Sequence, residues 1–218
     1  MNHTLHAGSR GHIEVICGCM FSGKSTEGSK HVSKEQLSKV RQPIIFTPLE
    51  AKRKLTLAES GIEVDTTQKM CSRAGSSFSA IEFTKDNPSV IVNHVQELLA
   101  AGKTITTVII EEAHFCSMDL VQVAKQLAEV FNMRVIVIGL DQTFDDIGFG
   151  PVPALMVEAE FVTKELAVCV NCGSFLASKS WLDTRAREDL TGKVLVGDKS
   201  YQALCRHCKR EFRQNFEA

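Results

Sequence analysis

The sequence predicts an α/β fold, with helices on both faces of a parallel β-sheet, followed by a small metal-binding domain. Three observations support this prediction. A β-prone run, His12–Cys17, leads into a glycine-bounded loop and then into a helical stretch. Further on, β-branched runs alternate with amphipathic stretches, as parallel strands and their crossover helices do. Two C-x-x-C pairs lie near the C-terminal end, at Cys169/Cys172 and Cys205/Cys208.

The glycine-bounded loop matches the pattern G-x-x-x-x-G-K-[ST] of a P-loop. Such a loop curls so that successive backbone N–H groups point at phosphate oxygens, and the helix after it adds the positive end of its dipole. The pattern therefore predicts a nucleoside-triphosphate site. We expect Lys24 to contact the β- and γ-phosphates and Ser25 to occupy one position on Mg²⁺. The phosphate-binding candidates here are Gly18, Cys19, Met20, Phe21, Ser22, Gly23, Lys24, Ser25 and Thr26.

The elements after this loop follow from hydrophobic periodicity and turn residues. Strands are expected at 43–47, 106–110 and 134–138, and helices at 26–40, 89–101, 118–131 and 153–159. Gly28 and Ser29 interrupt the first helix, and an interior glycine costs roughly 1 kcal/mol relative to alanine. Residues 49–79 show no sustained period, which is more typical of an active-site flap or mobile loop than of core.

Two carboxylates, Glu111 and Glu112, come directly after the strand expected at 106–110. Ligands of open α/β sheets bind at the carboxyl ends of the strands, so we expect both side chains to lie beside the P-loop. Glu111 is predicted to hold Mg²⁺ together with Ser25. Glu112 is predicted to take a proton from an attacking hydroxyl group or water molecule.

The two C-x-x-C pairs contain half of the eight cysteines. In a cytoplasmic protein, where disulfides are rare, two such pairs are typical of a structural zinc site with four thiolate ligands. A redox function for one pair is the alternative. We predict that Cys169, Cys172, Cys205 and Cys208 bind one Zn²⁺.

The composition is typical of a globular protein and argues against nucleic-acid-binding and membrane-spanning classes. A chain of 218 residues with 44% hydrophobic residues suits one main domain and a small appendage. Its formal net charge of −1 argues against a broad basic surface for nucleic acid. No run approaches the roughly 18 apolar residues of a membrane span, and residues 1–11 lack the apolar core of a signal peptide. We expect a cytoplasmic protein with a flexible lead-in at 1–11, a P-loop domain at 12–162 and a zinc domain at 163–218.

Taken together, several segments resemble the type II thymidine kinases, the family of the cytosolic animal enzyme and of most bacterial ones. They are Gly18–Thr26 (GCMFSGKST), Ile110–Phe115 (IEEAHF), Gly139–Phe144 (GLDQTF), Phe149–Pro151 (FGP), Val162–Lys164 (VTK), Ala167–Gly173 (AVCVNCG) and Tyr201–Cys208 (YQALCRHC). The resemblance implies an ATP:thymidine 5′-phosphotransferase with a P-loop domain and a zinc domain. It also implies a lasso loop over the nucleoside, a homotetramer and inhibition by the end product, dTTP.

The resemblance assigns functions to individual residues as well. Glu112 corresponds to the general base on the 5′-hydroxyl group, and Arg53 to a residue of the phosphate site. The implied nucleoside contacts are Met20, Phe115, Leu140, Phe144, Lys179, Val194, Val196 and Tyr201.

The sequence departs from the family pattern at several of these segments. Glu111 stands where the family has aspartate, His114 where it has glutamine, and Ala51 where it has aspartate. Lys179 and Trp181 occupy the lasso's T-x-R positions. Because an indole cannot make the forked hydrogen bonds of arginine, we expect weaker thymidine binding, which arginine at position 181 would restore. A kinase with another nucleoside choice, a related P-loop ATPase and a non-catalytic nucleotide-binding homologue remain alternatives.

Overall fold

A computed structural model describes residues 10–38, 40–51, 54–56, 63–65, 68–72, 74–182 and 201–214. Its centre is a six-stranded sheet in the order β10-β1-β9-β8-β2-β7. Every neighbouring pair in this sheet is parallel. The strands are β1 (His12–Gly18), β2 (Pro43–Pro48), β7 (Ile81–Phe83), β8 (Thr107–Ile110), β9 (Arg134–Leu140) and β10 (Phe161–Glu165). The parallel sheet confirms the predicted fold class.

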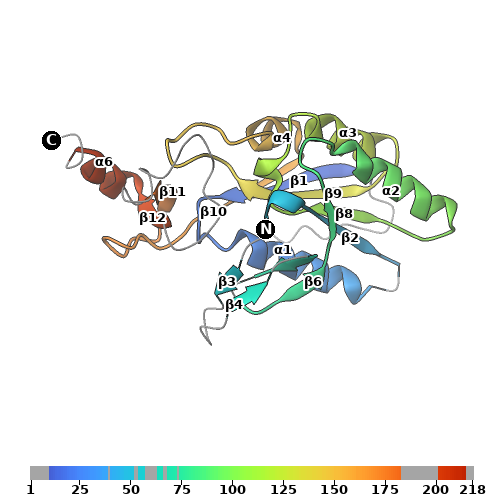
Figure 1. Cartoon of the computed structure of the whole chain (residues 1–218), viewed down its shortest axis with the longest axis horizontal. Helices are drawn as coiled ribbons and strands as arrows, with labels where there is room; N and C mark the ends of the chain where they lie inside the picture. Colours follow the sequence, from blue (N-terminus) through green and yellow to red (C-terminus); the bar gives the residue numbers. More distant parts are fainter. Residues whose placement is uncertain are drawn as a thin grey trace.

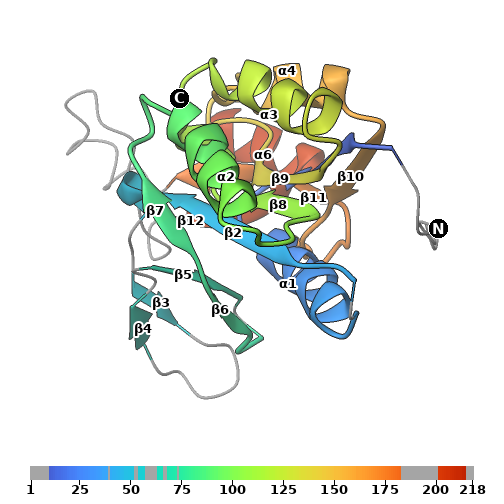
Figure 2. The ribbon, with the colours of Figure 1, turned by 90° about the vertical axis from the view of Figure 1, so that its right-hand side faces the viewer.

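Helices cover both faces of the sheet (Figures 1 and 2). On one face lies α1 (Lys24–Gln36). On the other lie α2 (Ser89–Ala100), α3 (Leu120–Glu129) and α4 (Val152–Glu158), which enclose the larger apolar core with the sheet. Short 3₁₀ turns follow β2 and β8, as η1 (Leu49–Ala51) and η2 (Ala113–Phe115). The predicted helices and central strands are therefore present, with ends shifted by a few residues.

The segment expected to lie outside the core contributes to it. Two antiparallel pairs form there, β3 (Lys54–Thr56) with β4 (Glu63–Asp65), and β5 (Lys69–Cys71) with β6 (Ser77–Ser79). Met70 of β5 is fully buried in the apolar cluster on the α1 face. The expectation was wrong for this part of the segment, because strands of three residues are too short to give a readable period.

Gly28 has a packing function in α1. A Cβ atom at this position would lie 2.3 Å from Cδ1 of Ile138 and 2.7 Å from Cε of Met70. Those distances are well below van der Waals contact, so a larger residue would require the ends of the Ile138 and Met70 side chains to shift. The helical cost of Gly28 is therefore offset by close packing.

A second, smaller unit follows the main sheet. β11 (Ala177–Leu182) and β12 (Tyr201–Cys205) form an antiparallel pair, and α6 (Arg206–Gln214) packs on it. This unit has its own apolar cluster, which includes Trp181 and Leu204, and it lies at one end of the molecule (Figure 1). The predicted domain boundary after residue 162 falls inside β10, whose five residues pair with β1. Among the helices of the described residues, none combines the length and apolarity needed to cross a membrane.

A buried charge network lies at the amino ends of β1 and β9, at the edge of the sheet away from the P-loop. Arg134 donates hydrogen bonds to Glu14 at 2.6 and 2.8 Å and to Glu35 at 2.6 Å. His12 Nε2 donates to Glu14 at 2.8 Å. Burial opposes ionisation of Glu14, but these hydrogen bonds outweigh it and lower the pKa of Glu14 to about 2.

We expect Glu14→Gln to lower the free energy of unfolding by about 2–3 kcal/mol at pH 7. Because the pKa of Glu14 is lowered on folding, its stabilisation is complete above pH 4.5 and is lost as pH falls towards 2. Urea unfolding at pH 7 and pH 3 should show the difference between the variant and wild type shrinking. Glu27→Gln, which removes an exposed pair with Lys30, should cost less than about 1 kcal/mol at pH 7. A Glu14→Gln deficit that is equal at both pH values contradicts the prediction.

Candidate active site

The P-loop connects the end of β1 to the start of α1. Gly18, Phe21 and Gly23 have φ values of 142°, 64° and 88°, so the chain curls back on itself between the two elements. A Cβ atom on Gly18 would lie 2.2 Å from the carbonyl oxygen of Glu165, and only glycine fits there. Lys24 Nζ donates to the carbonyl oxygen of Cys19 at 2.6 Å, across the mouth of the loop. This is a backbone cradle with one lysine ammonium, an arrangement that can bind phosphate.

Ser25 and Glu111, the two residues predicted to hold Mg²⁺, lie in direct contact. The hydroxyl group of Ser25 donates to Oε1 of Glu111 at 2.5 Å, and Glu111 is buried at the carboxyl end of β8. A hydroxyl and a carboxylate oxygen are the hard ligands that Mg²⁺ prefers. The donor set therefore fits the metal that accompanies a nucleoside triphosphate.

Glu112 directly precedes the turn η2 and has a φ of 51°, a left-handed conformation that is uncommon for a residue with a side chain. Oε2 of Glu112 lies 3.5 Å from Nε2 of the buried His114. The backbone N–H of Leu140 donates to Nδ1 of His114 at 3.2 Å, so a neutral ring carries its proton on Nε2, towards Glu112. An unusual backbone conformation and an oriented partner are common at functional sites.

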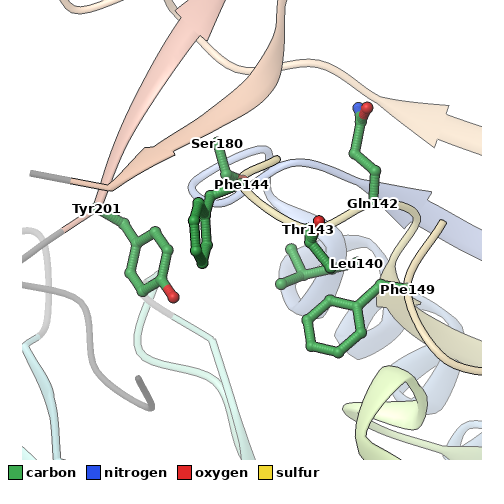
Figure 3. Close-up of a pocket in the computed structure, with 7 residues that line it drawn as sticks. All are labelled: Leu140, Gln142, Thr143, Phe144, Phe149, Ser180 and Tyr201. Atoms are coloured by element: carbon green, nitrogen blue, oxygen red, sulfur yellow. The ribbon is translucent and has the colours of Figure 1, made fainter. Parts of the chain in front are cut away.

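A pocket of about 300 Å³, part of it open to solvent, lies beside these residues. Its lining residues come from the end of β9, the loop after it, β11 and β12; they are Leu140, Gln142, Thr143, Phe144, Phe149, Ser180 and Tyr201 (Figure 3). The rings of Phe144, Phe149 and Tyr201 surround the space, whereas the Gln142 side chain points away from them. Flat apolar walls of this kind suit a planar ring.

The predicted nucleoside contacts divide into three groups. Leu140, Phe144 and Tyr201 line the pocket. Phe115, Met20 and Lys179 lie beside it: Phe115 packs on His114 with ring centroids 4.2 Å apart, Met20 donates its N–H to Ser180 Oγ, and Lys179 donates to Gln142 Oε1. Val194 and Val196 lie outside the described residues, and so does Arg53, which was predicted for the phosphate site.

Sequence reasoning missed four residues that line the pocket: Gln142, Thr143, Phe149 and Ser180. Position in the chain could have indicated Gln142 and Thr143, since both lie between two predicted contacts. Phe149 belongs to the F-G-P segment, and its ring centroid lies 4.7 Å from that of His114. Ser180 could have been indicated in the same way, since it lies between Lys179 and Trp181 in the lasso's T-x-R segment, and the antiparallel pairing of β11 with β12 brings it to the pocket.

The four cysteines of the C-x-x-C pairs come together as predicted. Their sulfur atoms all lie within 4.8 Å of one another, and those of Cys172 and Cys205 are 3.8 Å apart. Zn–S bonds of about 2.3 Å in a tetrahedron place sulfurs about 3.8 Å apart. Burial raises the pKa of Cys169, but backbone hydrogen bonds from Cys205, Cys172 and Asn171 outweigh it and lower this pKa to about 6. The cluster fits a structural zinc ion.

Comparison with known proteins now identifies the family. The family model described as thymidine kinase matches residues 11–209. The chain is also similar to a thymidine kinase of Porphyromonas gingivalis, with 35% identity over 210 residues that cover 94% of this chain and 89% of that protein. The chain belongs to the thymidine kinase family. This confirms the resemblance drawn from the P-loop, the Glu111-Glu112 segment and the paired cysteines, and with it the enzyme class.

Trp181 is a packing residue in this member of the thymidine kinase family. Its side chain is 4% exposed in the small apolar cluster, and its ring meets Phe212 of α6 edge-on, with centroids 5.7 Å apart. This placement changes the expectation for arginine at position 181, because a guanidinium group there would be buried among apolar side chains.

We expect Trp181→Arg to lower the free energy of unfolding by about 3 kcal/mol or more, since it removes indole packing and buries a charge. Urea unfolding would measure the loss. Trp181→Phe keeps an aromatic ring against Phe212 and should cost less. A stable Trp181→Arg variant with a lower KM for thymidine would instead support the family's arginine at this position.

Proposed function

We propose that the protein transfers the γ-phosphate of ATP to the 5′-hydroxyl group of thymidine, giving dTMP and ADP, in deoxynucleoside salvage. One observation supports this most strongly. The aromatic pocket lies next to the candidate base Glu112. Leu140 and Phe149 line the pocket, and both contact His114, whose Nε2 lies 3.5 Å from Oε2 of Glu112. A planar base in this pocket is therefore close to a carboxylate and to the P-loop edge of the sheet.

Each group at this edge has a function in the proposed reaction. The P-loop amides and Lys24 bind the triphosphate, and Ser25 and Glu111 would hold Mg²⁺, which would supply positive charge beside the phosphates. Glu112 accepts the proton of the 5′-hydroxyl group as it attacks the γ-phosphorus. Phosphoryl transfer requires positioning and charge neutralisation more than covalent catalysis, and this set of groups supplies both.

The remaining assignments extend the same proposal. Zn²⁺ on the four cysteines is structural, because four thiolates leave no open position.

We place the domain boundary after Glu165, the last residue of β10, and residues 166–218 in the zinc and lasso domain. β10 is an edge strand of the sheet, with Val162 43% exposed, and Phe175 is 79% exposed nearby in the chain. We also propose a homotetramer, as the resemblance to the family implies. We further propose a cytoplasmic enzyme that dTTP inhibits.

Product analysis tests the proposed reaction. Purified protein with ATP, Mg²⁺ and thymidine should form dTMP and ADP in equal amounts, and EDTA should abolish both. ADP without a nucleoside would indicate a P-loop ATPase, and binding of ATP without turnover would indicate a non-catalytic homologue. Either result contradicts the proposal.

A further inference from the structure

Lys209 joins two segments that lie on different sides of the pocket. It is 2% exposed, although it is a lysine in the first turns of α6. Its ammonium group donates to the carbonyl oxygen of Phe144 at 2.5 Å, to the carbonyl oxygen of Ser180 at 3.0 Å and to Oδ1 of Asp146 at 2.9 Å. An ammonium group has three donors, so all of them are used.

Asp146 extends this connection to other side chains. Its carboxylate also forms ion pairs, with Lys179 Nζ 3.2 Å from Oδ1 and Arg213 Nη2 2.9 Å from Oδ2. Lys179 in turn donates to Gln142 Oε1 at 2.8 Å. The loop after β9 is therefore attached to β11 and α6 by buried and half-buried polar contacts, which hold only in one arrangement of the three elements.

Phe144 and Ser180 both line the pocket, Phe144 from the loop after β9 and Ser180 from β11. One ammonium group bonded to both carbonyl groups sets the distance between these two walls. We infer that Lys209 is a positioning residue for the nucleoside: it fixes the width of the pocket without touching the ligand. This inference rests on the proposed function, since it assigns the pocket to a nucleoside.

The place of Lys209 in the chain gives it a second connection. It directly follows Cys208, one of the four clustered cysteines. A change in the position of Cys208 would therefore also move Lys209 and the hydrogen bonds that it makes beside the pocket. Among the described residues, the P-loop reaches Lys209 indirectly, through the hydrogen bond from the Met20 N–H to Ser180 Oγ, so ATP binding should respond much less than thymidine binding.

Lys209→Met tests the inference, because methionine keeps an unbranched apolar chain and removes all three donors. We expect the KM for thymidine to rise about tenfold or more, as loss of charge-assisted buried hydrogen bonds does, with the KM for ATP within about twofold. Arg210→Met is the matched control, since Arg210 is exposed on the same helix and bonds only to His207 among the described residues. It should leave both constants unchanged.

Hydrogen exchange without substrates measures the positioning itself. Amides of residues 141–150 should exchange faster in Lys209→Met than in wild type or Arg210→Met, with zinc content unchanged. If Lys209→Met does not fold, Asp146→Asn tests the same connection from the loop side and should raise the thymidine KM in the same direction. Unchanged exchange in the foldable variant, or an unchanged thymidine KM, overturns the inference. If the wild-type protein does not phosphorylate thymidine, the proposed function alone is refuted. The exchange experiment still tests whether Lys209 holds the loop after β9 in place.

Discussion

Glu112→Gln should lower kcat about 10²- to 10⁴-fold, the range typical of a lost general base. Glutamine keeps the size of the side chain and a contact to His114, 3.5 Å away in the wild-type protein, but it cannot accept the proton of the 5′-hydroxyl group. Nucleotide binding should change little, because the proposed phosphate site is the P-loop. Steady-state and single-turnover kinetics with thymidine would measure the effect.

Glu111→Gln is the matched comparison at the neighbouring position. Glu111 accepts the hydrogen bond of Ser25, so its variant should act chiefly by raising the Mg²⁺ concentration needed for half-maximal rate. If Glu112→Gln kept more than about a third of the wild-type kcat while chemistry was rate-limiting, Glu112 would not be the base.

Cys205→Ser should abolish zinc binding and unfold the small unit around β11, β12 and α6. Cys205 ends β12 directly before α6, and the apolar cluster of this unit is small. Zinc sites of this type supply much of the folding free energy of such units. Elemental analysis should find one zinc per wild-type chain and none in the variant. The emission of Trp181, the single tryptophan, should shift to the red as its indole becomes exposed.

Cys71→Ser is the control for this experiment, because Cys71 is buried in β5 outside the cysteine cluster. It should keep the zinc content and the emission of the wild type. Zinc content that Cys205→Ser leaves unchanged, or wild-type protein without metal, contradicts the assignment of the four ligands.

Sequence reasoning predicted the fold and the P-loop edge because these depend on local patterns. The glycine-bounded loop, the run of β-branched residues before Glu111 and the paired cysteines each specify a structure over a few residues. Parallel pairing of β1 and β8 with β9 then brings the carboxyl ends of these strands to one edge of the sheet. This is why Ser25 and Glu111 meet as predicted.

The features that sequence reasoning missed depend on contacts between distant segments. Gly28 appeared only to weaken a helix, and the positions of Met70 and Ile138 show that α1 packs closely on their side chains at this residue. Trp181 appeared to replace a ligand-binding arginine, but α6 places Phe212 against it. Lys209 lies among charged residues in the sequence, and its burial follows from the approach of the loop after β9. No local pattern encodes such contacts.

The most direct test of thymidine phosphorylation is a comparison of kcat/KM for three nucleosides with the same protein. We predict the highest value for thymidine, with deoxycytidine and deoxyguanosine lower, and no release of ADP in the absence of a nucleoside. A preference for deoxycytidine or deoxyguanosine, or equal release of ADP with and without nucleoside, would contradict it.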